Sequence, residues 1–172
     1  MEYQVDQAIE ILRRTPAVLR AMLSGLSPTW VTSNYGEKTF SPFDVVGHLI
    51  HGERTDWIPR ARIILGHGET RTFEPFDRYA MYEDCKGKTI GELLDTFEML
   101  RAESVTTLRA MKLTPEQLDR RGSHPELGTV LLREHLAMWV VHDLGHTAQI
   151  AKAMSYQYRE AIGPWQPHTS IL

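Results

Sequence analysis

Four stretches of the chain repeat apolar side chains every three to four residues, which is the period of an amphipathic α-helix. They run from about residues 5–26, 41–65, 89–111 and 129–156. No stretch keeps the strict alternation of apolar and polar residues that marks a half-buried strand. The pattern predicts an all-α fold, and the length of 172 residues suits a single domain, 1–172.

Prolines and capping residues indicate where these helices begin and bend. Ser41, Pro42 and Asp44 are residue types favoured at the N-cap, the first and the third position of a helix, so the second helix is expected to begin there. Pro16 either restarts or kinks the first helix. Pro59 is expected to bend the second helix.

Four amphipathic helices in one small domain predict a four-helix bundle. The link between the second and third helices, residues 67–88, is long and carries several aromatic side chains, including Phe73 and Phe76. A link of this length could cross the bundle, so that the two helices need not be antiparallel neighbours. Its aromatic side chains, together with Trp165, could line the mouth of a pocket, or the link could be a lid packed on the core.

Composition excludes some classes of function. The net charge is −3 and no basic excess indicates nucleic-acid binding. No apolar run approaches the ~20 residues of a membrane span, and the acidic N-terminus lacks the apolar core of a signal peptide, so a cytoplasmic protein is expected. The single cysteine, Cys85, cannot form an internal disulfide and is interpreted as a passive thiol in a loop.

The candidate chemistry lies in histidines at helical spacing. His142 and His146 are one turn apart, so both side chains lie on one face of the predicted fourth helix and can converge on one metal ion. His48, on the second helix, could complete the set. Gly47 and Gly145 directly precede two of these histidines, and their ~1 kcal/mol cost in a helix suggests close backbone approach or tight helix packing there.

Neighbouring polar residues could support such a site. Gln149 lies one turn beyond His146 and could orient a ligand or bind substrate, and His51 is a possible substitute ligand. Asp143 points about 100° away from His142 and is expected to face solvent. Glu53 points away from the site and is expected to be solvated or paired with Arg54 or a neighbouring helix. His135 is interpreted as a core or second-site histidine, and the remaining three histidines are expected to face solvent: His67, His124 and His168.

Four segments of the chain resemble the DinB-like (DinB/YfiT) superfamily of small metal-binding four-helix proteins. They are Leu12–Pro16, Ser41–Leu49, His142–Ile150 and Gly163–Trp165. The resemblance implies a bundle with a long crossover between helices two and three and a metal site of His48, His142 and His146. It also implies a homodimer.

The resemblance further implies several activities. Members of the superfamily include metal-dependent S-transferases that use low-molecular-weight thiols, a thiol-dependent isomerase and proteins described as metal-dependent hydrolases. The leading hypothesis is an enzyme that binds a divalent metal, zinc or nickel first, and activates water or a low-molecular-weight thiol toward a small-molecule substrate. One alternative is a non-catalytic metal-binding or stress-response protein with a structural or sensory metal. A further alternative is a helical dimer without metal.

Overall fold

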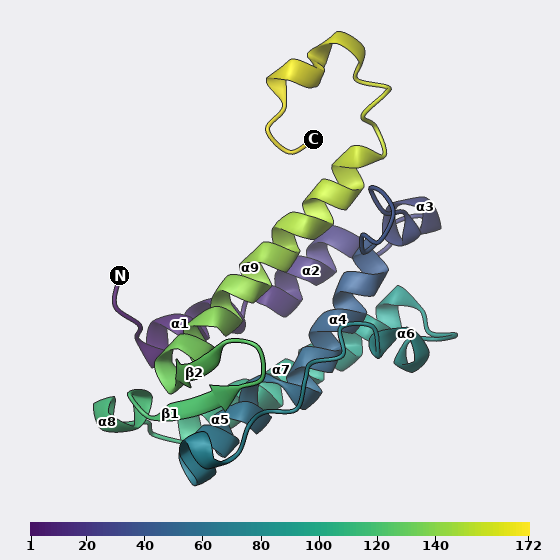
Figure 1. The fold of residues 1–172 in the computed structure, drawn as a ribbon. Helices are drawn as coiled ribbons and strands as arrows, with labels where there is room; N and C mark the ends of the chain where they lie inside the picture. The colour runs from purple at the N-terminus through teal and green to yellow at the C-terminus, as the bar shows by residue number, and fades with distance from the viewer.

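The structure is a computed structural model that describes residues 1–172, and its helices confirm the predicted fold class (Figure 1). The helices are α1 (Val5–Leu12), α2 (Thr15–Leu23), α3 (Pro28–Thr32), α4 (Pro42–Thr55), α5 (Trp57–His67), α6 (Met81–Asp84), α7 (Ile90–Ala110), α8 (Pro115–Leu118) and α9 (Leu132–Tyr156). The remaining elements are the 3-10 helices η1 (Gly68–Thr70) and η2 (Gly163–His168) and the strands β1 (Arg121–His124) and β2 (Gly128–Leu131). None of the helices combines the length and apolarity that crossing a membrane requires.

Two apolar clusters show how the bundle helices run. One cluster joins α2 and the end of α9 to the beginnings of α4 and α7, and the other joins α1 and the beginning of α9 to α5 and the end of α7. The pair α4–α5 therefore runs parallel to α7, and the pair α1–α2 runs parallel to α9. Residues 68–89, which join α5 to α7, must return along the bundle, and Figure 1 shows this segment beside α4.

Prolines divide two of the four predicted helices. The predicted second helix does not bend at Pro59 but breaks at Asp56, between α4 and α5. A proline ring clashes with the carbonyl group four residues earlier, and that residue is Thr55, the last residue of α4. The first helix restarts rather than kinks, since Thr15 and Pro16 open α2.

The strands β1 and β2 form an antiparallel hairpin that the sequence did not predict. Their four-residue length is too short to display an alternating pattern, and the turn depends on Gly128, whose φ is +73°. A Cβ at Gly122 would lie 2.6 Å from Ile64 Cγ1, so this glycine lets β1 approach α5 closely. The hairpin thereby covers one side of the bundle beside α5 and the start of α9.

The start of α4 agrees with the capping prediction. Ser41 Oγ accepts from the Asp44 amide at 3.2 Å, and Asp44 Oδ2 accepts from the Ser41 amide at 2.9 Å. Gly47 has the predicted close neighbour, because a Cβ there would lie 2.6 Å from Cys85 Sγ. Cys85 is therefore buried against α4 rather than placed in an open loop. The close packing predicted at Gly145 is wrong, since nothing lies within 4 Å of a Cβ built there.

Candidate metal centre

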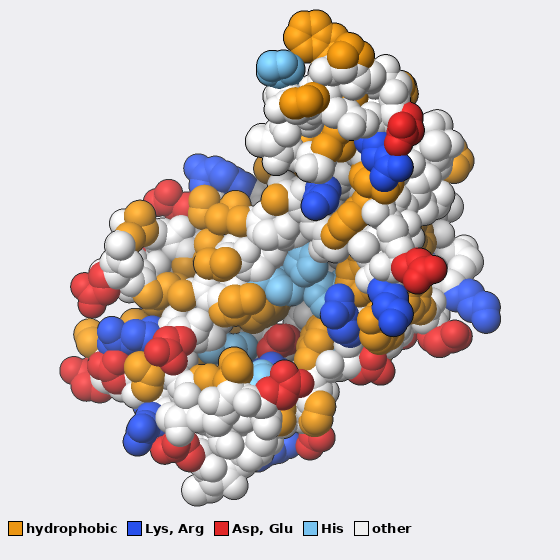
Figure 2. All heavy atoms as spheres, turned by 45° about the horizontal axis from the view of Figure 1, so that its top comes forward, with side chains coloured by type: hydrophobic (Ala, Val, Ile, Leu, Met, Phe, Trp, Pro, Cys, Tyr) orange, Lys and Arg blue, Asp and Glu red, His pale blue; other side chains and the backbone are white.

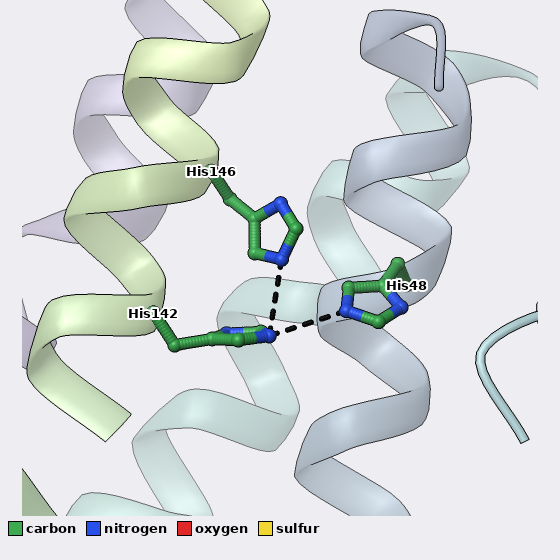
Figure 3. A group of neighbouring side chains, drawn as sticks. All are labelled: His48, His142 and His146. Carbon is green, nitrogen blue, oxygen red and sulfur yellow. Dashed lines mark hydrogen bonds between the residues drawn. The ribbon is translucent and has the colours of Figure 1, made fainter. Parts of the chain in front are cut away.

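Three histidine rings from two packed helices point toward one another (Figure 3). His48 comes from α4, and His142 and His146 come from successive turns of α9. His142 Nε2 lies 3.2 Å from His48 Nε2 and 3.0 Å from His146 Nε2. The candidate ligand atoms all lie within 4.8 Å of one another. The structure thus brings together the three residues that the sequence analysis singled out.

These rings are neutral at neutral pH. Burial, with a smaller contribution from the neighbouring His146, lowers the pKa of His48 to about 3 and that of His142 to about 2. Burial also lowers the pKa of His146. Each neutral imidazole carries one nitrogen with a free lone pair, which is the form that binds metal ions.

Gln149 fixes which nitrogen of His146 has the lone pair. The Gln149 Oε1 atom is 2.8 Å from His146 Nδ1, and because an amide oxygen only accepts, Nδ1 carries the proton. His146 Nε2 therefore presents its lone pair to the other two rings. The Gln149 amide nitrogen in turn donates to the Tyr35 hydroxyl at 3.4 Å. The prediction that Gln149 orients a ligand residue is consistent with these contacts.

The donor set fits a divalent cation. Two nitrogens that each bind one zinc ion at about 2.1 Å lie roughly 3.1–3.4 Å apart. The two pairs that include His142 Nε2 are close to this value, at 3.0 and 3.2 Å, and the whole donor set lies within 4.8 Å. Hydrogen bonding satisfies the cluster poorly, because His142 Nε2 faces two other ring nitrogens and can donate to only one. The Nδ1 atoms of His48 and His142 are also buried without a partner. A cation would satisfy all three converging nitrogens together.

A buried ion cluster lies behind these helices and corrects one prediction. Asp143 does not face solvent: it is fully buried and accepts from Arg101 Nη2 at 3.0 Å and from Thr15 Oγ1 at 2.6 Å. Arg101 also donates from Nη2 to Glu53 at 2.7 Å. Of the alternatives predicted for Glu53, the structure therefore shows pairing with a neighbouring helix rather than solvation or a pair with Arg54. Trp139 Nε1 donates to the same Glu53 oxygen at 3.2 Å.

A cavity of about 560 Å³ opens beside the histidine cluster, and His48 and His142 form part of its wall. The remaining wall combines aromatic side chains with charged ones from α5, the link 68–80, the hairpin and α9, among them Asp56, Trp57, Arg60, Phe73, Phe76, Arg78, Glu126 and Glu134. Figure 2 shows histidine side chains in a hollow on this face, with basic side chains beside them. A small molecule in the cavity would therefore reach the histidine cluster.

Two further histidines lie near the site without joining the cluster. His51 does not replace a ligand, because its ring packs on Phe76 with the centroids 5.0 Å apart and it lies outside the converging group. His135 lines the cavity and donates from Nε2 to the Trp57 carbonyl at 2.9 Å. Burial lowers the pKa of His135 to about 4, so this ring is neutral as well.

Other expectations about the surroundings of the site are partly wrong. His124 is half-buried in the cavity wall rather than facing solvent, because its Nδ1 accepts from the Glu126 amide at 3.1 Å within the hairpin turn. His67 and His168 are exposed, as predicted. Trp165 does not line the pocket: it is 68% exposed in η2, where the chain extends beyond the bundle.

Arg101 and Arg78 are the residues that sequence reasoning missed. A signal for Arg101 existed, since it follows the buried Phe97 by four residues and precedes the buried Leu108 by seven, which places its charge on the apolar face of α7. On α9, Asp143 likewise follows the buried Trp139 by four residues and precedes the buried Ile150 by seven. Arg78 gave no such signal, because only the folding of the long link brings it to the cavity.

Comparison with known proteins identifies relatives of the whole bundle. The family model of the DinB superfamily matches residues 11–150. The chain is 26% identical over 152 residues to the Bacillus subtilis (strain 168) protein named "Putative metal-dependent hydrolase YfiT", across 87% of this chain and 83% of that protein. A solved structure of YfiT from Bacillus subtilis superposes on this chain with a TM-score of 0.76 at 25% identity, covering 92% of this chain and 88% of that one. That protein is described as a probable metal-dependent hydrolase with an unusual four-helix bundle topology. TT2238, a four-helix bundle protein, superposes with a TM-score of 0.57 at 19% identity, covering 87% of this chain and 100% of that one, and supports the fold alone.

Proposed function

Because the chain belongs to the DinB superfamily, we propose that it is a metal-dependent enzyme in which His48, His142 and His146 hold one divalent cation, zinc or nickel. The convergence of three neutral imidazole nitrogens within 4.8 Å carries this proposal. The name and the description of the YfiT relative point to hydrolysis, and we assign the same reaction class to this chain.

The protein residues have distinct parts in such a site. A bound divalent cation supplies Lewis acidity and lowers the pKa of a coordinated water molecule or thiol toward neutrality. Gln149 holds His146 in the tautomer that presents Nε2, and burial keeps all three rings unprotonated. The aromatic side chains of Trp57 and Phe76 give a small substrate an apolar surface beside the cluster.

A low-molecular-weight thiol is the second candidate for the activated nucleophile. The only thiol of the chain, Cys85, is 5% exposed, lies beneath Gly47 and has its pKa raised by burial. It does not line the cavity. Any thiolate that reacted at this site would therefore have to arrive as a separate molecule.

Two observations favour catalysis over a structural or sensory metal. Structural zinc sites have four protein ligands, whereas the convergent group here has three, and the nearby carboxylates of Glu53 and Asp143 are occupied by Arg101. In addition, two of the three histidines border a cavity large enough for a small molecule.

The test is the metal content of untagged protein measured by mass spectrometry, followed by a hydrolysis screen of the metal-loaded protein with and without added thiols. We expect about one metal per chain in the wild type and its loss in His142→Ala. His67→Ala is the matched control, because His67 is exposed and lies outside the cluster.

Absence of metal after reconstitution with zinc and with nickel would refute the proposed site. Stoichiometric metal whose removal lowers the melting temperature, with no turnover in the screen, would favour the structural role instead.

A further inference from the structure

Arg78 is a cationic side chain at the cavity that has no carboxylate partner in the protein. It lies on the link between η1 and α6 and lines the cavity together with His48 and His142. Its guanidinium forms none of the ion pairs of the structure. Instead it lies over the Phe40 ring and the Tyr79 ring, 5.3 Å from each centroid. These rings hold the guanidinium in place without neutralising it.

Arg78 lines the cavity and is exposed, so its charge is accessible to an anion that enters from solvent. His48 and His142, two of the proposed metal ligands, line the same cavity as Arg78. Three neutral imidazoles would leave the full charge of a divalent cation uncompensated at the same place. An anion that lies between the metal and Arg78 would interact favourably with both.

The rest of the cavity restricts the kind of anion. Arg60 is already paired with Asp56 at 3.1 Å and donates to the Glu74 carbonyl at 2.9 Å, so it is not free to bind a second anion. Trp57 and Phe76 provide apolar surface next to the histidines. A guanidinium binds a planar carboxylate through two parallel hydrogen bonds.

We propose that Arg78 binds the carboxylate of a small-molecule substrate whose apolar body lies in the cavity against Trp57 and Phe76, an inference that rests on the proposed metal site. Arg78 is then a specificity-determining residue that selects acids over neutral molecules of the same shape. It also places the carboxylate group near the cation.

The test is calorimetric titration of zinc-loaded protein with phenylacetate, 3-phenylpropionate and octanoate, and with phenylacetamide as the neutral counterpart of phenylacetate. We expect the acids to bind the wild type and to bind Arg78→Ala about tenfold more weakly or worse, while phenylacetamide binds both proteins equally. Arg78→Lys is expected to recover part of the loss, because it restores the charge but not the planar fork. Arg71→Ala is the matched control, since Arg71 is exposed on the same link and does not line the cavity.

Equal affinity of the acids for the wild type and Arg78→Ala would overturn the inference, and so would the absence of acid binding to the wild type at millimolar concentration. Failure of the metal site would be seen separately, as absence of zinc by mass spectrometry. The same titration of metal-free protein would then decide whether Arg78 binds carboxylates without a cation.

Discussion

Arg101 of α7 and Asp143 of α9 form an ion pair that is sealed from solvent, with Nη2 and Oδ1 3.0 Å apart and side-chain exposures of 1% and 0%. Because Arg101 also binds Glu53 of α4 and the Leu12 carbonyl of α1, one guanidinium joins four helices of the bundle. Two of those helices carry the histidine cluster, and Asp143 directly follows His142. The ion cluster therefore fixes how α4 and α9 face each other at the site.

Replacing Arg101 by methionine is expected to lower the free energy of unfolding by about 3–5 kcal/mol, because two buried carboxylates then lose their counter-ion. Urea denaturation measures this loss. Arg109→Met, on the exposed surface of the same helix, should change stability by no more than about 0.5 kcal/mol. A loss below about 1 kcal/mol in Arg101→Met would contradict the buried role.

Replacing Gln149 by leucine is expected to weaken zinc binding about 10- to 100-fold, because the proton on His146 Nδ1 loses its acceptor and the ring is no longer held with Nε2 toward the cluster. Competition with a chelator of known affinity gives the zinc dissociation constant. Gln149→Glu keeps an oxygen acceptor and should retain tight binding. Equal affinities for the leucine variant and the wild type would remove Gln149 from the site.

His135 is expected to make stability depend on pH below about 6.5. Its pKa is about 4 in the folded protein, whereas an unfolded chain has the ordinary value of 6.5, so the unfolded state binds the proton first as the pH falls. The stability that the neutral His135 ring contributes is fully present above pH 6.5. It is lost progressively toward pH 4, at ~1.4 kcal/mol per pH unit.

Denaturation in the presence of a chelator, at pH 6.5 and at pH 5, tests this expectation. His135→Gln keeps a donor for the Trp57 carbonyl and should lose about 2 kcal/mol less than the wild type over that interval. The cluster histidines titrate in both proteins, so their effect cancels in the comparison. If both proteins lost the same free energy of unfolding between pH 6.5 and pH 5, the pKa of His135 would not be lowered in the folded protein.

Two helix glycines beside the histidine cluster should respond to alanine in opposite directions. Gly47→Ala is expected to destabilise the protein by about 1–2 kcal/mol, because the new methyl group would lie 2.6 Å from Cys85 Sγ. Gly145→Ala meets only open space and should stabilise it by up to about 1 kcal/mol. Thermal unfolding measures both, and the cost of Gly47→Ala should vanish in a Cys85→Ala background. Persistence of the cost there would place the clash elsewhere.

The sequence predicted those features that depend on spacing within one helix. The period of apolar residues located the bundle helices, and the capping residues Ser41 and Asp44 located the start of α4. The four-residue spacing of His142 and His146 placed both rings on one face of α9. Local geometry alone determines each of these, so no knowledge of tertiary contacts was needed.

Features that depend on several elements at once were missed or misjudged. Asp143 was predicted to face solvent because of its angle to His142. However, α9 packs against several elements, so its buried face is wider than the apolar face that the sequence pattern defines. The hairpin is too short to show a period, and it is stabilised by contacts with α5 rather than by its own pattern. Arg78 reaches the cavity only because the link 68–89 runs back along the bundle.

The distance along the chain between His48 and His142, which is 94 residues, has a consequence for biosynthesis. During translation α4 leaves the ribosome long before α9 has been made, so the nascent chain carries one of the three donors without the other two. A site of this composition cannot be loaded stepwise as the protein emerges. Under the proposed metal site, metal capture would be a late event in maturation, confined to molecules in which α9 has docked against α4.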